Sequence, residues 1–193
     1  MANPNFGLSF DWETTGSDWE YKFSTHKYQG ITLGMVIFDF ANLMPIADKY
    51  IEFKFDSEKF IWTKEAEAIH GLSIEYLRQN GLSREEGLVQ VLEFLLKWFG
   101  PDPVIPVLGH NVEFDIAFMQ ELFQSHELHF KPAHRKFDTA SISQVLFGNS
   151  RSDFLFDTLG LDKRGLHNAL DDAKLTLEAA RRLRLIMNDT LFS

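Results

Sequence analysis

The sequence has no cysteine among its 193 residues. This absence excludes disulfide bonds, zinc sites with thiolate ligands and a cysteine nucleophile, and it fits a reducing compartment. The chain also lacks any apolar run near the roughly 20 residues that span a bilayer. Its first residues, MANPNFGLSFD, have neither a basic start nor a cleavage site. We therefore expect a soluble, cytoplasmic protein.

Basic residues are also in the minority. The sequence has 19 Lys and Arg against 28 Asp and Glu, which gives a net charge of -9. Binding along a long nucleic acid depends on many cations that release counterions, so this charge argues against a protein that coats such a polymer. The 45% hydrophobic content is nevertheless sufficient for the core of one domain over residues 1–193.

Hydrophobic periodicity alternates between strand and helix without a linker or a repeat. The expected strands cover residues 6–10, 31–40, 50–55 and 104–108, with a turn at 42–45, and the expected helices cover 88–99 and about 169–187. Three strands in succession favour an antiparallel meander. We therefore predict an α/β fold whose mixed central sheet, a meander followed by parallel strands, is flanked by helices.

Acidic residues stand where predicted hydrophobic elements end. Asp11 and Glu13 follow the first strand, and the alternation of a strand points both side chains to the same side. Asp115 follows the strand at 104–108 and lies at the inward end of an apolar helical face. A carboxylate in such a position needs a partner, because burial penalises an isolated charge.

A third acidic stretch opens the last helix. Asn168 is the predicted N-cap, which leaves His167 in the preceding loop and Asp172 in the first turns of the helix. The neighbouring Asp171 is an alternative for the inward acid, but it falls at the third helical position, where a reciprocal capping role is favoured. The imidazole and the carboxylate can then reach one pocket.

Converging carboxylates repel one another unless a positive charge lies between them. No lysine or arginine occurs within any of the three stretches, so their acids favour divalent metal ions as partners. Each acid alone has an ordinary structural explanation as a turn former or a helix-end charge. Together they predict a two-metal phosphodiesterase site.

In their order and flanking residues, these stretches resemble the DEDDh exonucleases. This DnaQ-like family includes the proofreading subunit of bacterial replicative polymerase, RNase T and oligoribonuclease. The residues that carry the resemblance are Asp11, Glu13, Thr14, Thr15 and Gly16, then His110, Asn111, Phe114 and Asp115, then His167, Ala169 and Asp172, with Ile69, His70, Gly71, Leu72, Asp138 and Thr139 as secondary signatures. The resemblance covers nearly the whole chain and implies a ribonuclease H-like domain.

The resemblance implies a metal-dependent 3′–5′ exonuclease that releases nucleoside 5′-monophosphates. Two Mg2+ or Mn2+ ions are expected per active site, with Asp11 between them. Glu13 and Asp172 would hold one ion, and Asp115 would support the other. His167 is the expected general base, because a neutral imidazole is available near its ordinary pKa of about 6.5.

Further residues are expected to contact the terminal nucleotide. The predicted substrate-binding residues are Thr14, Thr15, Gly16, His70, Asn111 and Phe114. For His70, a hydrogen bond at a helix end is an equal alternative. For Phe114, a core position is favoured over stacking on a base.

The segment 17–30 interleaves aromatic and basic residues. It contains Trp19, Tyr21, Phe23 and Tyr28 together with Lys22, His26 and Lys27. Such a pattern suits stacking of a single strand. An extra β-hairpin is slightly favoured, because residues 19, 21 and 23 share strand parity.

A basic run, three histidines and the C-terminus also have possible functional roles. The basic residues Lys131, His134, Arg135 and Lys136 form a run that either guides a phosphate backbone or is a solvated loop. The histidines at 126, 129 and 134 lack the spacing of a zinc motif. The C-terminus faintly resembles peptides that dock onto a sliding clamp, although packing of the helix end on the core is favoured.

The sequence is compatible with three functions. The first is removal of nucleotides from single-stranded or frayed DNA 3′ ends, as in proofreading or repair, with a polymerase or sliding clamp as a partner and a homodimer as an assembly. The alternative is a 3′–5′ exoribonuclease for short RNA or RNA 3′ tails, because nothing in the sequence reads the 2′-hydroxyl. The third is an inactive module that binds nucleic acid or a polymerase.

Overall fold

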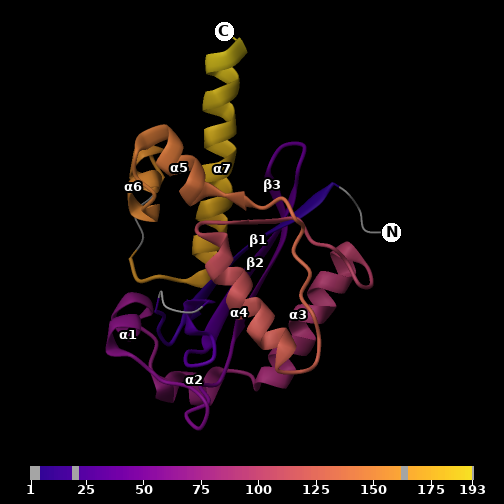
Figure 1. The fold of residues 1–193 in the computed structure, drawn as a ribbon, viewed down its shortest axis with the longest axis vertical. Helices are drawn as coiled ribbons and strands as arrows, with labels where there is room; N and C mark the ends of the chain where they lie inside the picture. The colour runs from indigo at the N-terminus through magenta and orange to yellow at the C-terminus, as the bar shows by residue number, and fades with distance from the viewer. Residues whose placement is uncertain (1–4, 19–21, 162–164, 193) are drawn as a thin grey trace.

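The computed structural model describes residues 5–18, 22–161 and 165–192. At its centre is a five-stranded sheet with the order β3-β2-β1-β4-β5 (Figure 1). The strands are β1 (Phe6–Thr14), β2 (Gly30–Asp39), β3 (Met44–Glu52), β4 (Val107–Gly109) and β5 (Phe137–Asp138). The first three strands pair antiparallel, and β4 and β5 continue the sheet in parallel. The predicted mixed α/β sheet is confirmed.

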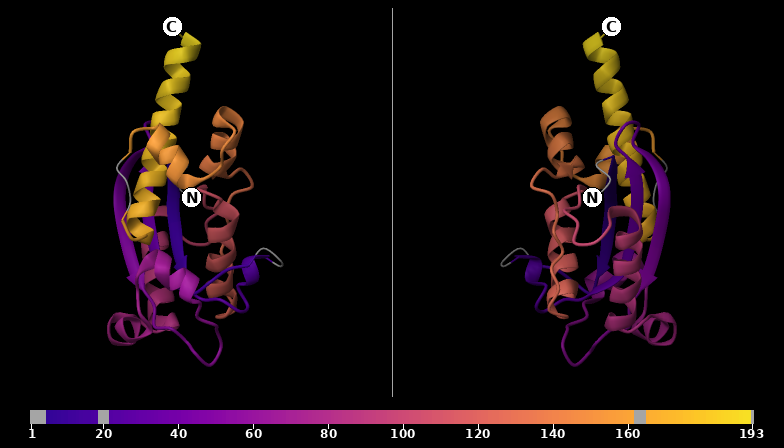
Figure 2. Two further views of the ribbon diagram at one scale, coloured as in Figure 1. Left: turned by 90° about the vertical axis from the view of Figure 1, so that its left-hand side faces the viewer. Right: turned by 90° about the vertical axis from the view of Figure 1, so that its right-hand side faces the viewer.

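Helices cover both faces of the sheet. They are α1 (Lys64–His70), α2 (Ile74–Asn80), α3 (Arg84–Phe99), α4 (Val112–Gln124), α5 (Thr139–Phe147), α6 (Ser152–Thr158) and α7 (Ala169–Phe192), with a 3-10 helix, η1, at Lys22–Ser24. The apolar faces of α3 and α4 pack on one side of the sheet, and α7 packs on the other. Figure 2 shows α7 running along the sheet and past its end. No helix in the described ranges is long and apolar enough to cross a membrane.

The central strand β1 presents different residues to the two layers. Phe10 and Trp12 belong to the core formed with α3 and α4. On the opposite face, the Ser9 hydroxyl donates a hydrogen bond to the Ala173 carbonyl of α7, at 2.9 Å. By strand parity, Asp11 and Glu13 lie on the α7 side.

The expected end of the first strand at residue 10 is wrong. Pairing with β2 continues through Asp11 opposite Gly34 and Glu13 opposite Thr32. Both acids therefore lie within a strand whose backbone is fixed by its neighbour, and they do not follow it in a loop. This arrangement restricts the directions of the two carboxylates more than a loop would.

The third strand begins six residues earlier than expected, at Met44 and not at Tyr50. The turn also closes early, because Asp39 accepts hydrogen bonds from the backbone N–H groups of Ala41 (2.8 Å) and Leu43 (2.7 Å). Most side chains in the first half of β3 are exposed, so no apolar pattern marked it.

Other boundaries differ by a few residues. The capping box of Ser83 and Glu86 starts α3 at Arg84, before the predicted 88, whereas its end before Gly100 is confirmed. The strand expected at 104–108 is β4, shifted to Val107–Gly109. The last helix starts at Ala169 as predicted and extends beyond 187.

A close approach between β2 and α7 places the start of the last helix. A Cβ atom at Gly34 would lie 2.3 Å from the backbone carbonyl carbon and oxygen of Ala169. Only glycine leaves room for a backbone at this distance. The first turn of α7 therefore rests directly on the sheet, beside the acids of β1.

Candidate active site

A cleft of about 560 Å³ opens beside the C-terminal half of β1. Of the residues predicted from the sequence, its lining contains Asp11, Glu13, Thr14, Gly16, His70, Phe114, His167 and Asp172. These residues come from β1, α1, α4 and α7 and from the loops beside them. Thr15, Asn111 and Asp115 are not part of the lining.

Glu13, His167 and Asp172 converge within the cleft. One ligand atom from each of the three lies within 4.8 Å of the other two. The Nδ1 atom of His167 is 3.4 Å from Oδ2 of Asp172. Both carboxylates are buried, whereas the imidazole is partly exposed. Carboxylate and imidazole donors gathered in this way fit a divalent cation, and Asp11 adds a further carboxylate to the same cleft.

The start of α7 fixes the third acidic stretch. The Asn168 side-chain oxygen accepts hydrogen bonds from the backbone N–H groups of Leu170 (3.0 Å) and Asp171 (3.2 Å), so it is the N-cap as predicted. Asp171 is exposed and Asp172 is 3% exposed, so Asp172 is the inward acid. The backbone N–H of His167 donates to the Ile69 carbonyl at 3.1 Å, which ties the loop to α1.

Asp115 lies behind the cleft, and its carboxylate contacts β1, the strand that carries Asp11 and Glu13. Its side chain is part of the buried face of α4, as predicted, and the residue is only 2% exposed. Pairing between β4 and β1 stops at Ser9, so the N–H of Trp12 has no partner on β4. It donates a hydrogen bond to Oδ1 of Asp115 at 3.0 Å. Nothing in the sequence indicated this contact.

The environment of Asp115 disfavours its charge. Burial raises the pKa of this carboxyl well above its ordinary value, the Trp12 hydrogen bond lowers it, and the charge of Glu13 raises it again. Burial has the largest effect. A cation in the cleft would offset this penalty, so the surroundings of Asp115 also fit a metal.

For His70, the alternative role of a hydrogen bond at a helix end is confirmed. Its Nδ1 accepts the backbone N–H of Leu72 at 3.0 Å, which is the hydrogen bond at a helix end. The neutral ring therefore carries its proton on Nε2, which is buried and has no hydrogen-bond partner among the described residues. Burial lowers the pKa of His70 and favours the neutral form. His70 thus lines the cleft in its neutral form, with the Nε2–H group buried.

Phe114 contacts both other aromatic rings and the cleft. Its ring packs on Phe118 at 4.9 Å and on Phe23 at 5.3 Å between centroids. Phe114 is half-buried and packs against the core without being part of it, and the side chain lines the cleft as well.

Asn111 faces a neighbouring depression, not the cleft. The residue has a left-handed backbone (φ 63°), and its N–H donates to the Asp138 carboxylate at 2.7 Å. This contact joins the second motif to the Asp138 signature. The depression adjoins the cleft, because His110 and Ser152 line both.

Contacts that the sequence did not indicate hold the wall formed by residues 14–16. The Thr15 carbonyl accepts hydrogen bonds from the N–H (2.8 Å) and the hydroxyl (3.0 Å) of Thr63, the N-cap of α1. The Thr15 hydroxyl accepts the Gln29 N–H at 3.0 Å. The helical pattern after Thr63 could have revealed its capping role, but nothing in the sequence marked Gln29.

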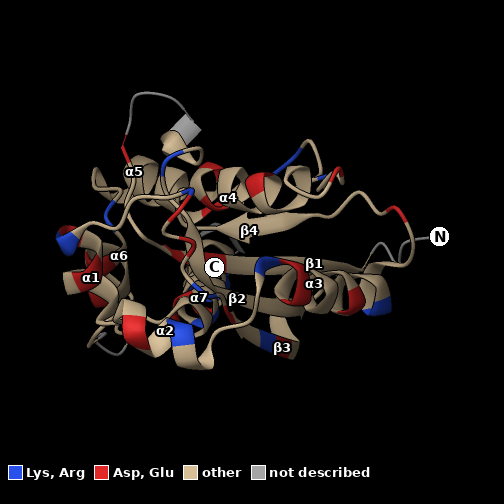
Figure 3. Cartoon of the chain, turned by 90° about the horizontal axis from the view of Figure 1, so that it is seen from below, with Lys and Arg blue, Asp and Glu red and all other residues tan. Residues whose placement is uncertain are grey.

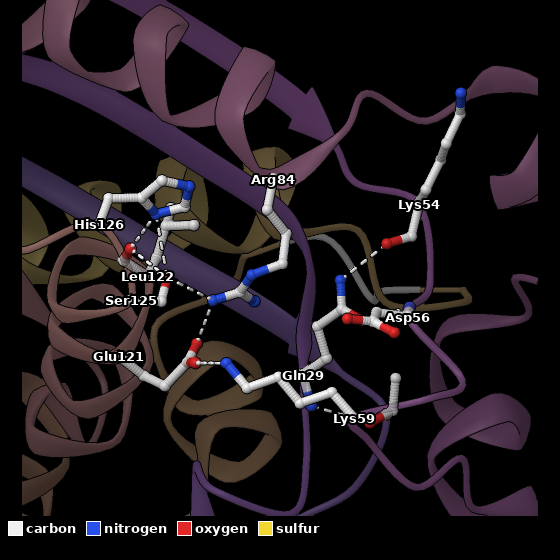
Figure 4. A network of polar contacts seen from close by, with 10 residues as sticks. Gln29, Lys54, Asp56, Lys59, Arg84, Glu121, Leu122, Ser125 and His126 are labelled. Carbon is white, nitrogen blue, oxygen red and sulfur yellow. Dashed lines mark hydrogen bonds and ion pairs between the residues drawn. The ribbon is translucent and has the colours of Figure 1, made fainter.

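Figure 4 shows the polar contacts behind this wall. The Gln29 amide donates to the Lys54 carbonyl and accepts the Asp56 N–H, both at 2.8 Å. Nearby, Glu121 accepts a hydrogen bond from Arg84 at 2.7 Å and pairs with Lys59 at 3.4 Å. These contacts hold the loop before α1 against α3 and α4.

The expected β-hairpin in 17–30 is wrong for the residues that the structure describes. After η1, the Ser24 carbonyl accepts the N–H groups of Lys27 (2.8 Å) and Tyr28 (3.0 Å), which forms a turn where the hairpin required extended chain. Trp19 and Tyr21 lie outside the described residues. Tyr28 lines the cleft, although the sequence did not single it out as a site residue.

The basic run and the histidine trio do not join the cleft. Lys131 pairs with Asp102 and Lys136 with Glu113, so acids compensate part of the run. In the view of Figure 3, acidic and basic positions are interspersed over the helices. The histidines at 126, 129 and 134 form no metal cluster in the described part of the chain. The side chains of residues 189–193, in the segment that faintly resembles clamp-docking peptides, lie outside the described residues.

Comparison with known proteins gives the family. The family model RNase_T, described as exonuclease, matches residues 8–180. The oligoribonuclease of Vibrio parahaemolyticus is 27% identical over 123 residues, which are 64% of each chain. That of Acinetobacter baylyi is 31% identical over 117 residues, which are 60% of each chain. The matches thus cover slightly less than two thirds of these relatives.

Solved structures agree on the fold. The nuclease domain of 3′hExo, a DEDDh family member bound to rAMP, has a TM-score of 0.71 at 15% identity, covering 96% of this chain and 95% of that one. Escherichia coli Exonuclease I with a dT13 oligonucleotide has a TM-score of 0.78 at 15% identity, covering 97% and 43%. These likenesses confirm the ribonuclease H-like fold. Because the family model spans all three acidic stretches, the chain belongs to the RNase_T exonuclease family, the DEDDh-type, divalent-metal-dependent 3′–5′ exonucleases.

Proposed function

We propose that this chain removes nucleoside 5′-monophosphates from the 3′ ends of short RNA. One observation carries the proposal: the carboxylates of Glu13 and Asp172 and the imidazole of His167 each place one atom within 4.8 Å of the other two, in a cleft that Asp11 also lines. A chain with a net charge of -9 suits capture of a strand end at this point better than contact along a duplex.

Asp11, Glu13, Asp115 and Asp172 are the proposed metal ligands. When bound, two Mg2+ or Mn2+ ions would polarise the scissile phosphate, activate water and stabilise the leaving oxygen. Asp115 would act from behind the cleft through its remaining carboxylate oxygen, because its other oxygen accepts the Trp12 N–H.

His167 is the proposed general base. Asp172 lies beside Nδ1 of the imidazole and favours a proton on that nitrogen. The Nε2 atom is then the acceptor for the proton of the attacking water. The partial exposure of the ring leaves it room to pass that proton on to solvent.

The terminal nucleotide is proposed to lie along the wall formed by residues 14–16. Thr14 and Gly16 would hold its sugar through backbone and hydroxyl groups, and Thr15, which is buried outside the lining, would keep them in place. The Nε2–H of His70 would donate to an oxygen of the nucleotide, and Phe114 would contact the base. Asn111 would reach the strand only from the neighbouring depression.

RNA is proposed ahead of DNA because both relatives described above are named oligoribonucleases. This reverses the order favoured by sequence analysis, in which single-stranded or frayed DNA came first. The structures of 3′hExo and Exonuclease I do not decide the sugar, because at 15% identity they bear on the fold alone.

Matched 5′-labelled RNA and DNA oligomers of identical sequence test this choice. We expect kcat/KM to be at least about tenfold higher for RNA, a preference of about 1.4 kcal/mol. Mass spectrometry of the released nucleotide should give a 5′-monophosphate. Equal or faster cleavage of DNA would reject the RNA assignment and restore single-stranded DNA as the substrate.

A further inference from the structure

The segment between β1 and β2 contributes aromatic residues to the cleft, outside the three acidic stretches. Tyr28 is half-buried and lines the cleft directly. Phe23, in η1, packs edge-on against Phe114 at 5.3 Å between ring centroids. One aromatic lining residue thus comes from this segment, and a second is held by it.

The backbone around Tyr28 is fixed on both sides. Before it, the Lys27 carbonyl accepts the N–H of Ile61 at 2.8 Å. After it, Gln29 makes two hydrogen bonds with Thr15, the residue that follows β1. The Gln29 N–H donates to the Thr15 hydroxyl at 3.0 Å, and the Gln29 carbonyl accepts the Thr15 N–H at 2.9 Å. A residue whose backbone is already held in this way loses less conformational freedom when a ligand packs on its side chain.

The ring of Tyr28 lies directly over Gly16. A Cβ atom at Gly16 would lie 2.7 Å from two carbons of the ring, so any side chain there would displace the tyrosine. Gly16 belongs to the proposed sugar-binding wall. The aromatic surface therefore begins where the sugar contacts end, which is the position that a base attached to that sugar would occupy.

Phe23 has an unfavourable backbone for a bulky residue. Its φ of 59° and ψ of 20° lie in the left-handed region, and the next residue, Ser24, has a φ of 49°. Such strain persists only where the surroundings enforce it, and it gathers at functional sites. Here the conformation coincides with the contact between the Phe23 ring and Phe114.

We infer that Tyr28 is a specificity-determining residue whose ring stacks on the base of the 3′-terminal nucleotide, with Phe114 as the second aromatic contact. The inference rests on the proposed function and adds its base-binding residue. Every base has a π face, so Tyr28 distinguishes a terminal nucleotide with a base from one without a base, and does not read the identity of the base.

Two oligomers that differ only in the base of the 3′-terminal nucleotide test the inference. One ends in an ordinary nucleotide, and the other ends in an abasic sugar. We expect the wild-type protein to cleave the ordinary end about tenfold more efficiently in kcat/KM. Tyr28→Ala should reduce this ratio severalfold through a higher KM, whereas Tyr28→Phe should retain it. Tyr76→Ala, at an exposed tyrosine on α2 that does not line the cleft, is the matched control.

The outcomes separate the inference from the proposed function. An unchanged ratio in Tyr28→Ala overturns the inference, as does an equal loss of rate on both oligomers, because that result indicates a structural role. Loss of the ratio in Tyr28→Phe overturns it too, because the hydroxyl and not the ring would then recognise the nucleotide. If the wild-type protein shortens neither oligomer, the proposed function itself fails.

Discussion

At the scale of single residues, Asp115 shows what a buried acid costs and why the protein keeps it. Burial raises its pKa well above the ordinary value of 3.8. Between about pH 4 and the raised pKa, the folded state keeps the Asp115 proton, whereas the unfolded state has released it. The free energy of unfolding therefore falls as the pH rises across this interval. A metal bound nearby would reverse this preference.

Asp115→Asn tests the balance. Asparagine keeps an acceptor for the Trp12 N–H but cannot ionise. In chelator, the variant should be more stable than the wild-type protein by about 1 kcal/mol at neutral pH, and the difference should shrink as the pH falls toward 4. Urea unfolding across this range measures it. A variant less stable at every pH would show that the charged carboxylate is needed for folding.

His167 is the residue for which the sequence and the geometry both suggest proton transfer. His167→Ala should reduce kcat by about 10²- to 10⁴-fold with a small change in KM, because general-base catalysis contributes about that much. The profile of kcat against pH should lose the inflection that a titrating imidazole gives the wild-type enzyme. Asn168→Ala, which alters the adjacent cap, is the control for local disturbance. Retention of the full rate in His167→Ala would remove the general-base assignment.

At the scale of elements, the approach of α7 to β2 positions the acid on the last helix relative to those on β1. Gly34→Ala would place a methyl group 2.3 Å from the Ala169 backbone. Moving α7 away should cost about 1–3 kcal/mol of stability and lower kcat, because Asp172 would shift from Glu13. Thermal unfolding and steady-state kinetics measure the two effects. Gly165→Ala, whose added atom has open space, should change neither.

The wall between β1 and α1 depends on a second junction. Thr63→Ala removes the cap of α1 and one hydrogen bond to the Thr15 carbonyl, and should cost about 1 kcal/mol. Ser73→Ala removes the comparable cap of α2, which does not line the cleft, so it is the matched control. Thermal unfolding should show a similar loss for both, while only Thr63→Ala should raise KM. An equal KM in both variants would show that α1 does not position the substrate.

These elements differ in how far the sequence predicted them. The helix that carries Asp172 was predictable because Asn168 and an apolar face mark its start. The first half of β3 was not, because an exposed edge strand has no apolar alternation. The turn around Ser24 was missed because aromatic residues at alternate positions fit a hairpin as well as a wall held by side-chain contacts.

At the scale of the whole molecule, the fold brings together residues that are far apart in the sequence. Strand parity predicted that Asp11 and Glu13 share a side. The hydrogen bond between Asp115 and Trp12 could not be predicted, because it depends on β4 ending after three residues and leaving the Trp12 N–H without a partner on that strand. Gln29 escaped prediction, because its contacts with Thr15, Lys54 and Asp56 arise only from the fold. Tyr28 was named only as one of several aromatic residues of the segment 17–30, and its place in the cleft could not be predicted from the sequence.

The acids of the cleft are proposed to support metal-dependent hydrolysis from a 3′ end. The most direct test is product analysis of a 5′-labelled short RNA with Mg2+, with Mn2+ or with chelator, for the wild-type protein and for Asp11→Asn. We predict a metal-dependent ladder that shortens from the 3′ end, absent in chelator and nearly absent in an Asp11→Asn protein that melts like the wild type. Undiminished cleavage by a clean, folded Asp11→Asn preparation would contradict the account.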